Sequence, residues 1–353
     1  MDSTRWIFIV KSYSSSSLGF SVFLVDPISK KIIQELMGNC RITYRQMAKK
    51  TGITATSVKK RISKLWKNRV ISRPYVQLSL AMRDAEISHT DLTTDGTEHD
   101  EQLITQLGSH PSVFGAVRVG LHKFASGGNV VGPTGLFELG RFYRKISCVK
   151  EVDIQLVRPV GPSPVPPSQL YIYRGQKMTF TDPQLKILQL LWQNARISAK
   201  DIGEQTNYSA RRVGQILREL QTGGGLYFMV HMRPSMMDSI PFWLIIDYDE
   251  IKIEPYAAVK WVYEQFPDAY WNAWLFANKP TIMHFCTAET IRTISDIVNI
   301  TKEAPFTKQV RSEIFRPQKY FVGPGYIQLG ELLGIKVSNH EAEYYSGKSE
   351  HGF

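Results

Sequence analysis

RITYRQMAKKTGITATSVKKRISKL, residues Arg41–Leu65, aligns without a gap with RISAKDIGEQTNYSARRVGQILREL, residues Arg196–Leu220, at an offset of 155 residues. Each stretch has the pattern of two short helices joined by a tight turn, and the second helix carries most of the exposed polar and basic side chains. Because the same pattern occurs twice with the same spacing, the sequence predicts a chain built by duplication of one module.

The pattern also predicts where each helix begins and turns. Thr43 is a suitable N-cap for the first helix of the pair, Gly52 can adopt the positive φ of the turn, and Thr54 can cap the second helix. Val58, Ile62 and Leu65 recur at i, i+4 and i+7 and should face inward. The second copy holds Ser198, Asn207, Ser209, Val213, Leu217 and Leu220 in the matching places. This arrangement is typical of a helix-turn-helix, whose second helix reads the major groove of DNA.

A further helix precedes each pair, and an extended stretch follows it. Asp26-Pro27 and Asp182-Pro183 place an N-cap and an N1 proline before apolar runs, which is a good helix start. Val70–Leu80 and Leu226–Met232 then stand in the place of a wing or exit strand. We therefore expect two winged helix-turn-helix modules, at residues 26–73 and 181–225.

The outward side chains of the two recognition helices, Ala55–Lys67 and Ala210–Leu220, are candidate DNA contacts. Those at the N-terminal end of the first helix could reach base edges, namely Thr54, Thr56, Ser57, Lys59 and Lys60. Those further along could contact phosphates, namely Lys64, Lys67, Arg69 and Arg73. The second module offers Arg211, Arg212, Gln215 and Arg218. It also has Glu219 and Gly223–Gly225, whereas the first gathers seven cations between Lys59 and Arg73, so we expect weaker binding by the second.

Composition agrees with a polyanionic partner inside a cell. The chain has 353 residues, a formal net charge of +11 and a pI of about 9.4. Cys40, Cys148 and Cys286 are widely spaced and predict reduced thiols, and the histidines show no metal-ligand spacing. Trp6–Val10 is too short for a signal peptide or a membrane span. We expect a cytoplasmic, nucleoid-associated protein without cofactor, metal site or membrane partner.

The remaining sequence predicts a similar plan in each half. A proline-rich linker, Arg158–Ser168, divides the halves. We expect ferredoxin-like units at residues 74–158 and 226–317, the first beginning with a strand at Pro74–Met82 and a mostly loop segment at Asp84–Glu101. The other expected segments are an N-terminal extension or β-hairpin at 1–25, the linker with a strand at 159–180, and a C-terminal tail at 318–353. Since each unit leaves one sheet face open, the halves should pack together as a single-chain pseudo-dimer.

Asp26–Ile71 resembles the N-terminal module of the Lrp/AsnC transcription regulators. Arg41-Ile42-Thr43, Arg61-Ile62 with Leu65, and Val70-Ile71 match the motifs of that family, while Arg69 stands where the family has glycine. The second module keeps Arg196-Ile197-Ser198 but has Ile216-Leu217 where the family has Arg-Ile. The resemblance implies an α+β fold of two winged helix-turn-helix modules, each followed by a ferredoxin-like ligand unit, in a bacterial or archaeal DNA-binding regulator.

The resemblance leaves some questions open. Family members that sense amino acids tend to carry a Gly-x-x-Asp signature, whereas here Leu121-His122-Lys123 follow Gly120 without an Asp, which argues against amino-acid sensing. A small-molecule effector and further homodimerisation remain open. Siroheme decarboxylases resemble the same fold, so such an enzyme is one alternative to a regulator without enzymatic activity. A second winged module that binds protein is another.

Overall fold

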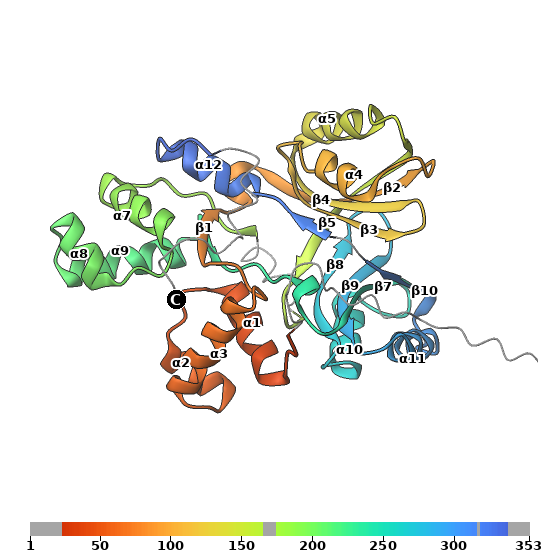
Figure 1. Ribbon diagram of the computed structural model, residues 1–353, viewed down its shortest axis with the longest axis horizontal. Helices are drawn as coiled ribbons and strands as arrows, with labels where there is room; N and C mark the ends of the chain where they lie inside the picture. The colour runs from red at the N-terminus through yellow and green to blue at the C-terminus, as the bar shows by residue number, and fades with distance from the viewer. Residues whose placement is uncertain (1–22, 165–173, 316–317, 338–353) are drawn as a thin grey trace, which may run out of the picture.

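The computed structural model describes residues 23–164, 174–315 and 318–337 (Figure 1). Most of the expected N-terminal extension, the centre of the proline-rich linker and the end of the expected C-terminal tail lie outside these residues. Each half of the chain contains a three-helix module followed by an α/β unit, as the repeat predicts.

Both three-helix modules have the predicted order. The first consists of α1 (Pro27–Gly38), α2 (Tyr44–Thr51) and α3 (Ala55–Lys67), and the second of α7 (Asp182–Gln193), α8 (Ala199–Thr206) and α9 (Ala210–Thr222). The predicted inward residues of α3 and α9 are all buried. α7 begins at Asp182, one residue before the sequence suggested, because Thr181 is its N-cap, with the side chain of Gln184 accepting from the Thr181 N–H at 3.0 Å.

Both α/β units have the ferredoxin-like βαββαβ order. The first consists of β2 (Ala85–Thr94), α4 (Asp100–Leu107), β3 (Val113–Gly120), β4 (Lys123–Val131), α5 (Gly132–Arg144) and β5 (Val149–Val160). The second consists of β7 (Ile240–Tyr248), α10 (Pro255–Gln265), β8 (Tyr270–Phe276), β9 (Thr281–Ala288), α11 (Ile291–Lys302) and β10 (Thr307–Ile314). In each unit the strands pair in the order last, first, third, second.

The chain at the end of each unit pairs with the sheet of the other unit. Pairs from Val157↔Phe276 to Val160↔Ala273 join β5 to β8, so the two sheets are continuous. Residues after β10 form β11 (Gln318–Tyr320), which pairs with β3 of the first unit. The eight strands of the two units and β11 thus form one nine-stranded sheet that begins with β10 and ends with β11, two neighbouring strands of the chain. The open faces of the two units therefore turn toward each other, and α4, α5, α10 and α11 cover the outside (Figure 1).

The sequence-based assignment fails in the first unit at Asp84–Glu101. We expected mostly loop there, but Ala85–Thr94 is the central strand β2, paired with β4 on one side and β5 on the other. This segment reads as a loop because its sequence is polar. In the structure Ser88, His89 and Thr90 are nevertheless all buried. The expected first strand, Pro74–Met82, is instead the short strand β1 (Tyr75–Leu78) and the 3-10 turn Ala81–Arg83 outside the large sheet.

Two expected boundaries are also wrong. Pro159 and Val160 belong to β5. The pairs between β5 and β2 end at Val157, so beyond that residue β5 pairs with β8 alone, and proline is tolerated where no ladder donor is needed. The expected tail contains β11 and α12 (Pro324–Leu332), which packs on β1; Tyr326 stacks on Trp192 of α7 at 3.7 Å between ring centroids. Over the three described ranges, no helix combines the length and apolarity that crossing a membrane requires.

Candidate nucleic-acid interface

The first module is held together at the start of α1. Asp26 accepts a hydrogen bond from the Ser29 N–H at 2.7 Å and pairs with the Arg61 guanidinium of α3 at 2.5 Å. Burial acts to raise the pKa of Asp26, but the bonds from Arg61 and Ser29 outweigh it and hold the pKa below the ordinary value. Arg61 therefore fixes α3 against α1. Unlike the other six cations between Lys59 and Arg73, it was not among the predicted DNA contacts.

Local caps set the direction of α3. Thr43 and Gln46 form a reciprocal capping box at the start of α2, and Gly52 ends α2 with φ of 72°. The Thr54 hydroxyl then accepts from the Ser57 N–H at 3.1 Å and caps α3. Thr54 thus has a structural role in addition to its exposed position at the N-terminal end of the helix.

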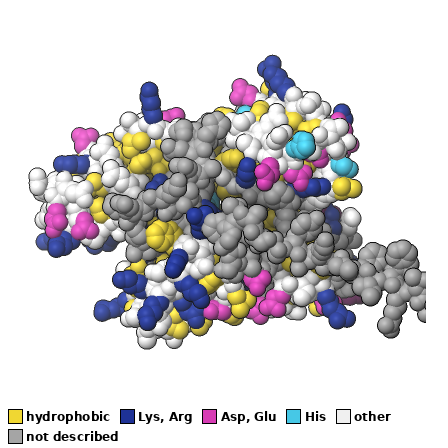
Figure 2. Space-filling model, in the orientation of Figure 1, with side chains coloured by type: hydrophobic (Ala, Val, Ile, Leu, Met, Phe, Trp, Pro, Cys, Tyr) yellow, Lys and Arg dark blue, Asp and Glu magenta, His cyan; other side chains and the backbone are white. Residues whose placement is uncertain are grey.

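The outer face of α3 is cationic. Lys59, Lys60, Lys64 and Lys67 are exposed, and Lys64 lies over the Phe23 ring at 5.0 Å. Across the described ranges, no carboxylate lies within 4.0 Å of any of these four amines. Thr56 is exposed beside them and Ser57 is half-buried. Figure 2 shows Lys and Arg side chains gathered over this module, in the lower left of the view. A helix face that only contacts solvent usually carries both signs of charge, so this cationic face favours a polyanionic partner.

The two arginines beyond α3 lie closer to the body of the protein. Arg69 and Arg73 are both half-buried, and Arg69 takes a left-handed conformation with φ of 58°. This conformation is strained for a residue with a Cβ, which accounts for the glycine found at this place in the Lrp/AsnC pattern.

The second module has the same geometry with weaker charge. Ser198 caps α8, Asn207 ends it with φ of 61°, and Ser209 caps α9. Four predicted contacts are exposed on α9, namely Arg211, Arg212, Gln215 and Arg218. Three side chains on this face are, however, linked by hydrogen bonds. Arg212 donates to Gln215 at 3.2 Å, and Gln215 donates to Glu219 at 2.9 Å. The carboxylate of Glu219 thus lowers the positive charge of α9.

Two equivalent arginines join the modules. Arg41 donates to the carbonyl oxygens of Ala195 at 2.5 Å and Ile197 at 3.1 Å, the two residues that flank Arg196. Arg196 donates in return to the carbonyls of Cys40 and Ile42, which flank Arg41. A contact in which i meets j and j meets i is the mark of a twofold relation. Sequence reasoning used both arginines as motif residues and missed this role.

The exit strands join the modules a second time. β1 and β6 (Leu226–Met229) form an antiparallel pair, with Tyr75 opposite Met229 and Leu78 opposite Leu226. The two stretches expected to be wings therefore pair with each other over Tyr75–Leu78 and Leu226–Met229. Beside them His231 stacks on Tyr75 at 5.1 Å and hydrogen-bonds its hydroxyl, and burial lowers the pKa of His231 to about 4. The two recognition helices are consequently carried on one connected support.

Comparison with known families now identifies the modules. The family model for winged helix-turn-helix DNA-binding domains matches residues 25–72 and 181–224. Both modules are winged helix-turn-helix domains. The predicted duplication is thereby confirmed, and the residues of α3 and α9 discussed above lie within the two matched ranges.

Known proteins resemble parts of the chain. An uncharacterized HTH-type transcriptional regulator of Pyrococcus abyssi is 49% identical over 47 residues, which are 13% of this chain. The match spans 30% of the length of that relative. Among solved structures, the siroheme decarboxylase NirDL has a TM-score of 0.49 at 12% identity, over 86% of this chain and 97% of its own. AsnC of E. coli has a TM-score of 0.31 at 18% identity, over 38% of this chain and 92% of its own. At these values neither structure bears on what the present chain does.

Proposed function

We propose that this protein is a transcription regulator of the Lrp/AsnC type that binds specific double-stranded DNA sequences, mainly through α3. The observation that carries the proposal is the exposed face of α3, where Lys59, Lys60, Lys64 and Lys67 lack carboxylate partners among the described residues. Within a winged helix-turn-helix domain this helix is the one that enters the major groove. A cytoplasmic, nucleoid-associated location follows from the same proposal.

The position along α3 divides the expected roles. Thr56, Lys59 and Lys60 lie in the first turns, near enough to the groove floor to contact base edges. Lys64 and Lys67 lie in the last turn and should contact phosphates, which sets affinity without reading sequence. Lys60→Ala should therefore relax sequence preference, with a loss of about 1–3 kcal/mol if Lys60 makes a good base contact.

The chain should act as its own dimer on DNA. The Arg41–Arg196 exchange and the β1–β6 pair support this proposal because they fix one module relative to the other. Since α9 differs from α3 in sequence and in charge, the preferred site should be asymmetric rather than a perfect palindrome. Binding through α9 should be weaker, because Glu219 lies among its arginines.

The dependence of affinity on salt tests the phosphate contacts. Fluorescence anisotropy with a labelled duplex would be measured from low to physiological salt for the wild type, Lys67→Ala and Lys302→Ala. Lys302 is an exposed lysine in the last turn of α11 and serves as the matched control. Loss of one phosphate contact should lower the slope of log K against log salt by about 0.9 for Lys67→Ala only. Equal slopes for all three proteins would contradict the proposed interface.

The size of the cavity between the two α/β units bears on the enzyme alternative. The cavity between the two α/β units has a volume of about 240 Å³. This volume is below the roughly 300–1,000 Å³ of pockets for drug-sized ligands and is small for a four-ring tetrapyrrole. A Soret absorbance band that co-purifies with the protein would instead support an enzyme of the siroheme decarboxylase kind.

A further inference from the structure

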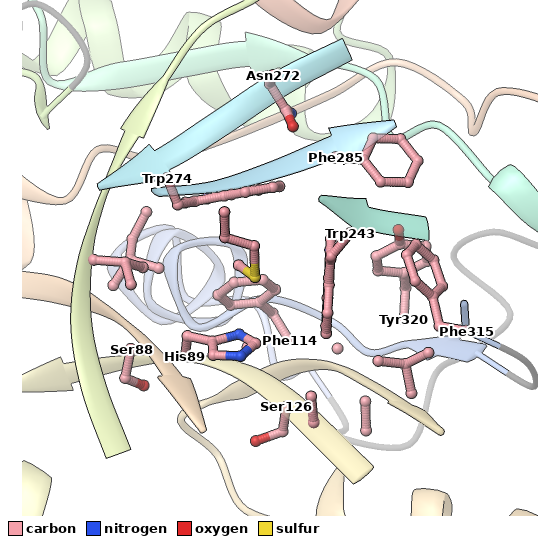
Figure 3. A pocket seen from close by; sticks show the side chains of 18 of the residues that line it. Ser88, His89, Phe114, Ser126, Trp243, Asn272, Trp274, Phe285, Phe315 and Tyr320 are labelled. Carbon is pink, nitrogen blue, oxygen red and sulfur yellow. The ribbon is translucent and has the colours of Figure 1, made fainter. Parts of the chain in front are cut away.

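A cavity lies where the open sheet faces of the two α/β units meet. Its lining comes from β2, β3 and β4 of the first unit and from β7, β8 and β9 of the second (Figure 3). On one side of the cavity the pairing of β5 with β8 joins the two sheets, and on the other side β11 pairs with β3.

Several aromatic side chains line the cavity. Trp243, Trp274 and Phe285 come from the second unit, and Phe114 comes from the first (Figure 3). Their flat faces offer apolar contact to another flat molecule, and stacked or edge-on aromatic pairs are more stable than burial alone accounts for. The ring of His89 lies edge-on to Trp243, with centroids 5.1 Å apart and an angle of 80° between the planes.

Two polar side chains, His89 and Asn272, face this apolar space from opposite walls. Nε2 of His89 lies 3.1 Å from the carboxylate of Asp91, and a neutral ring that donates through Nε2 keeps the lone pair of Nδ1. His89 is only 5% exposed. On the other wall, the side-chain oxygen of Asn272 is buried and has no hydrogen-bond partner among the residues that the structure describes. Figure 3 shows Asn272 pointing into the cavity from the upper strands, with His89 below Trp243. An unpaired buried acceptor destabilises the protein, and a donor on a ligand would remove that penalty.

The size of the cavity restricts the ligand. An engineered protein cavity of about 150 Å³ holds benzene. At about 240 Å³ the present cavity has room for two fused rings. Charged ligands are disfavoured, because the apolar walls would remove their hydration without supplying a counter-ion.

We infer that the cavity binds a neutral, planar, two-ring aromatic molecule that carries an N–H donor, with Asn272 or His89 accepting the hydrogen bond. Indole is the simplest member of this class. Met37 of α1 and Met232, after β6, also line the cavity. The ligand would therefore contact the first helix of the first winged module and the segment that follows the exit strand of the second. We propose that it acts as an effector of DNA binding, a step that rests on the function proposed above.

Calorimetric titration of the full chain tests the binding step without DNA. The probes are indole and 1-methylindole, which has the same shape but lacks the N–H. The proteins are the wild type, Asn272→Leu and the exposed control Asn299→Leu. We expect the wild type and the control to bind indole with a sub-millimolar Kd and to bind 1-methylindole at least tenfold more weakly. Asn272→Leu should bind the two probes within about twofold of each other.

The outcomes that overturn the binding step are clear. If wild-type protein binds neither probe, or binds both equally, the proposed recognition of an N–H donor is wrong. If Asn272→Leu keeps the full preference for indole, with a circular dichroism spectrum like that of the wild type, His89 must be tested as the acceptor. Loss of that preference in His89→Phe would then support the site, and its persistence in both variants would refute it.

The effector step is measured separately. Saturating indole should change the affinity of the wild type for its DNA at least threefold, while 1-methylindole at the same concentration should have a smaller effect. Indole binding with an unchanged DNA affinity would reject the effector role and leave the binding site standing. Failure of the protein to bind DNA at all would refute the proposed function without bearing on the calorimetric result.

Discussion

Arg41→Ala should loosen both winged modules at once. The substitution removes the two charge-assisted hydrogen bonds from Arg41 to Ala195 and Ile197 and leaves both carbonyl oxygens without that donor. Each hydrogen bond to a charged group contributes about 1.5–3 kcal/mol when buried. Because the guanidinium is partly exposed and water can replace part of each bond, we count the two together as less than two full bonds and expect the second module to open about 2 kcal/mol more easily.

Native-state hydrogen exchange followed by mass spectrometry measures this opening. An increase of about 2 kcal/mol corresponds to roughly 30-fold faster exchange, since 1.4 kcal/mol is a factor of ten. The peptide that spans α8 should show the increase, although α8 begins 158 residues after Arg41 in the sequence (199 minus 41). Arg196→Ala should in turn speed exchange in α2, because its hydrogen bonds run to Cys40 and Ile42.

Arg45→Ala is the matched control, since Arg45 is exposed and only four residues from Arg41. It should change the opening free energy of either module by less than about 0.5 kcal/mol. If Arg41→Ala speeds exchange only in α2 and leaves α8 as in the wild type, the reciprocal contact does not join the modules and this reasoning is refuted.

Three further results are expected. Burial lowers the pKa of Lys30 from 10.5 to about 8, so between these pH values the unfolded state binds more protons than the folded state. The stability of the wild type should therefore rise with pH over this range, and that of Lys30→Met should rise less. The midpoint of thermal unfolding measures both. Gly52→Ala should lower the free energy of unfolding by about 1–2 kcal/mol, because φ of Gly52 is 72°. Gly38→Ala is the control: Gly38 ends α1 and has free space for a Cβ, so this change should be neutral or stabilising. Urea denaturation measures both. Arg61→Ala should destabilise the fold by about 1 kcal/mol above pH 4, an effect that disappears as acid protonates Asp26, while the salt slope of DNA binding stays unchanged.

The local structure of the winged modules could be predicted from the sequence because short-range rules determine it. Thr43, Gly52 and Thr54 cap or turn the chain as expected, and Asn207 takes the left-handed place of Gly52 in the second copy. Each of these positions depends on residues within one helical turn. The inward faces of α3 and α9 follow from periodicity in the same way.

The long-range pairing could not be predicted. Ala85–Thr94 reads as a polar loop, because Ser88, His89 and Thr90 become buried only when the second unit and the helices cover them. Likewise nothing near Pro159 indicates that it pairs with Trp274, and nothing near Gln318 indicates a strand against β3. These contacts depend on the fold of the other half of the chain.

The candidate site divides along the same line. The exposure of Lys59, Lys60, Lys64 and Lys67 follows from the helical period. The pairing of Arg61 with Asp26 spans 35 residues and was missed, although Arg-to-Asp spacing between two helices of one module could have suggested it. The cavity around Trp243, Trp274 and His89 draws on both units, so no local pattern marks it.

Selection of bound fragments from sheared genomic DNA by the purified full chain tests the central claim most directly, at physiological salt with random-sequence DNA as competitor. The account predicts recovery of a common, asymmetric sequence motif. Lys60→Ala should relax that motif over one part of the site, and Arg212→Ala should have a smaller effect over the other part. Recovery of fragments with no shared sequence, or an equal or larger effect of Arg212→Ala, would contradict sequence-specific binding led by α3.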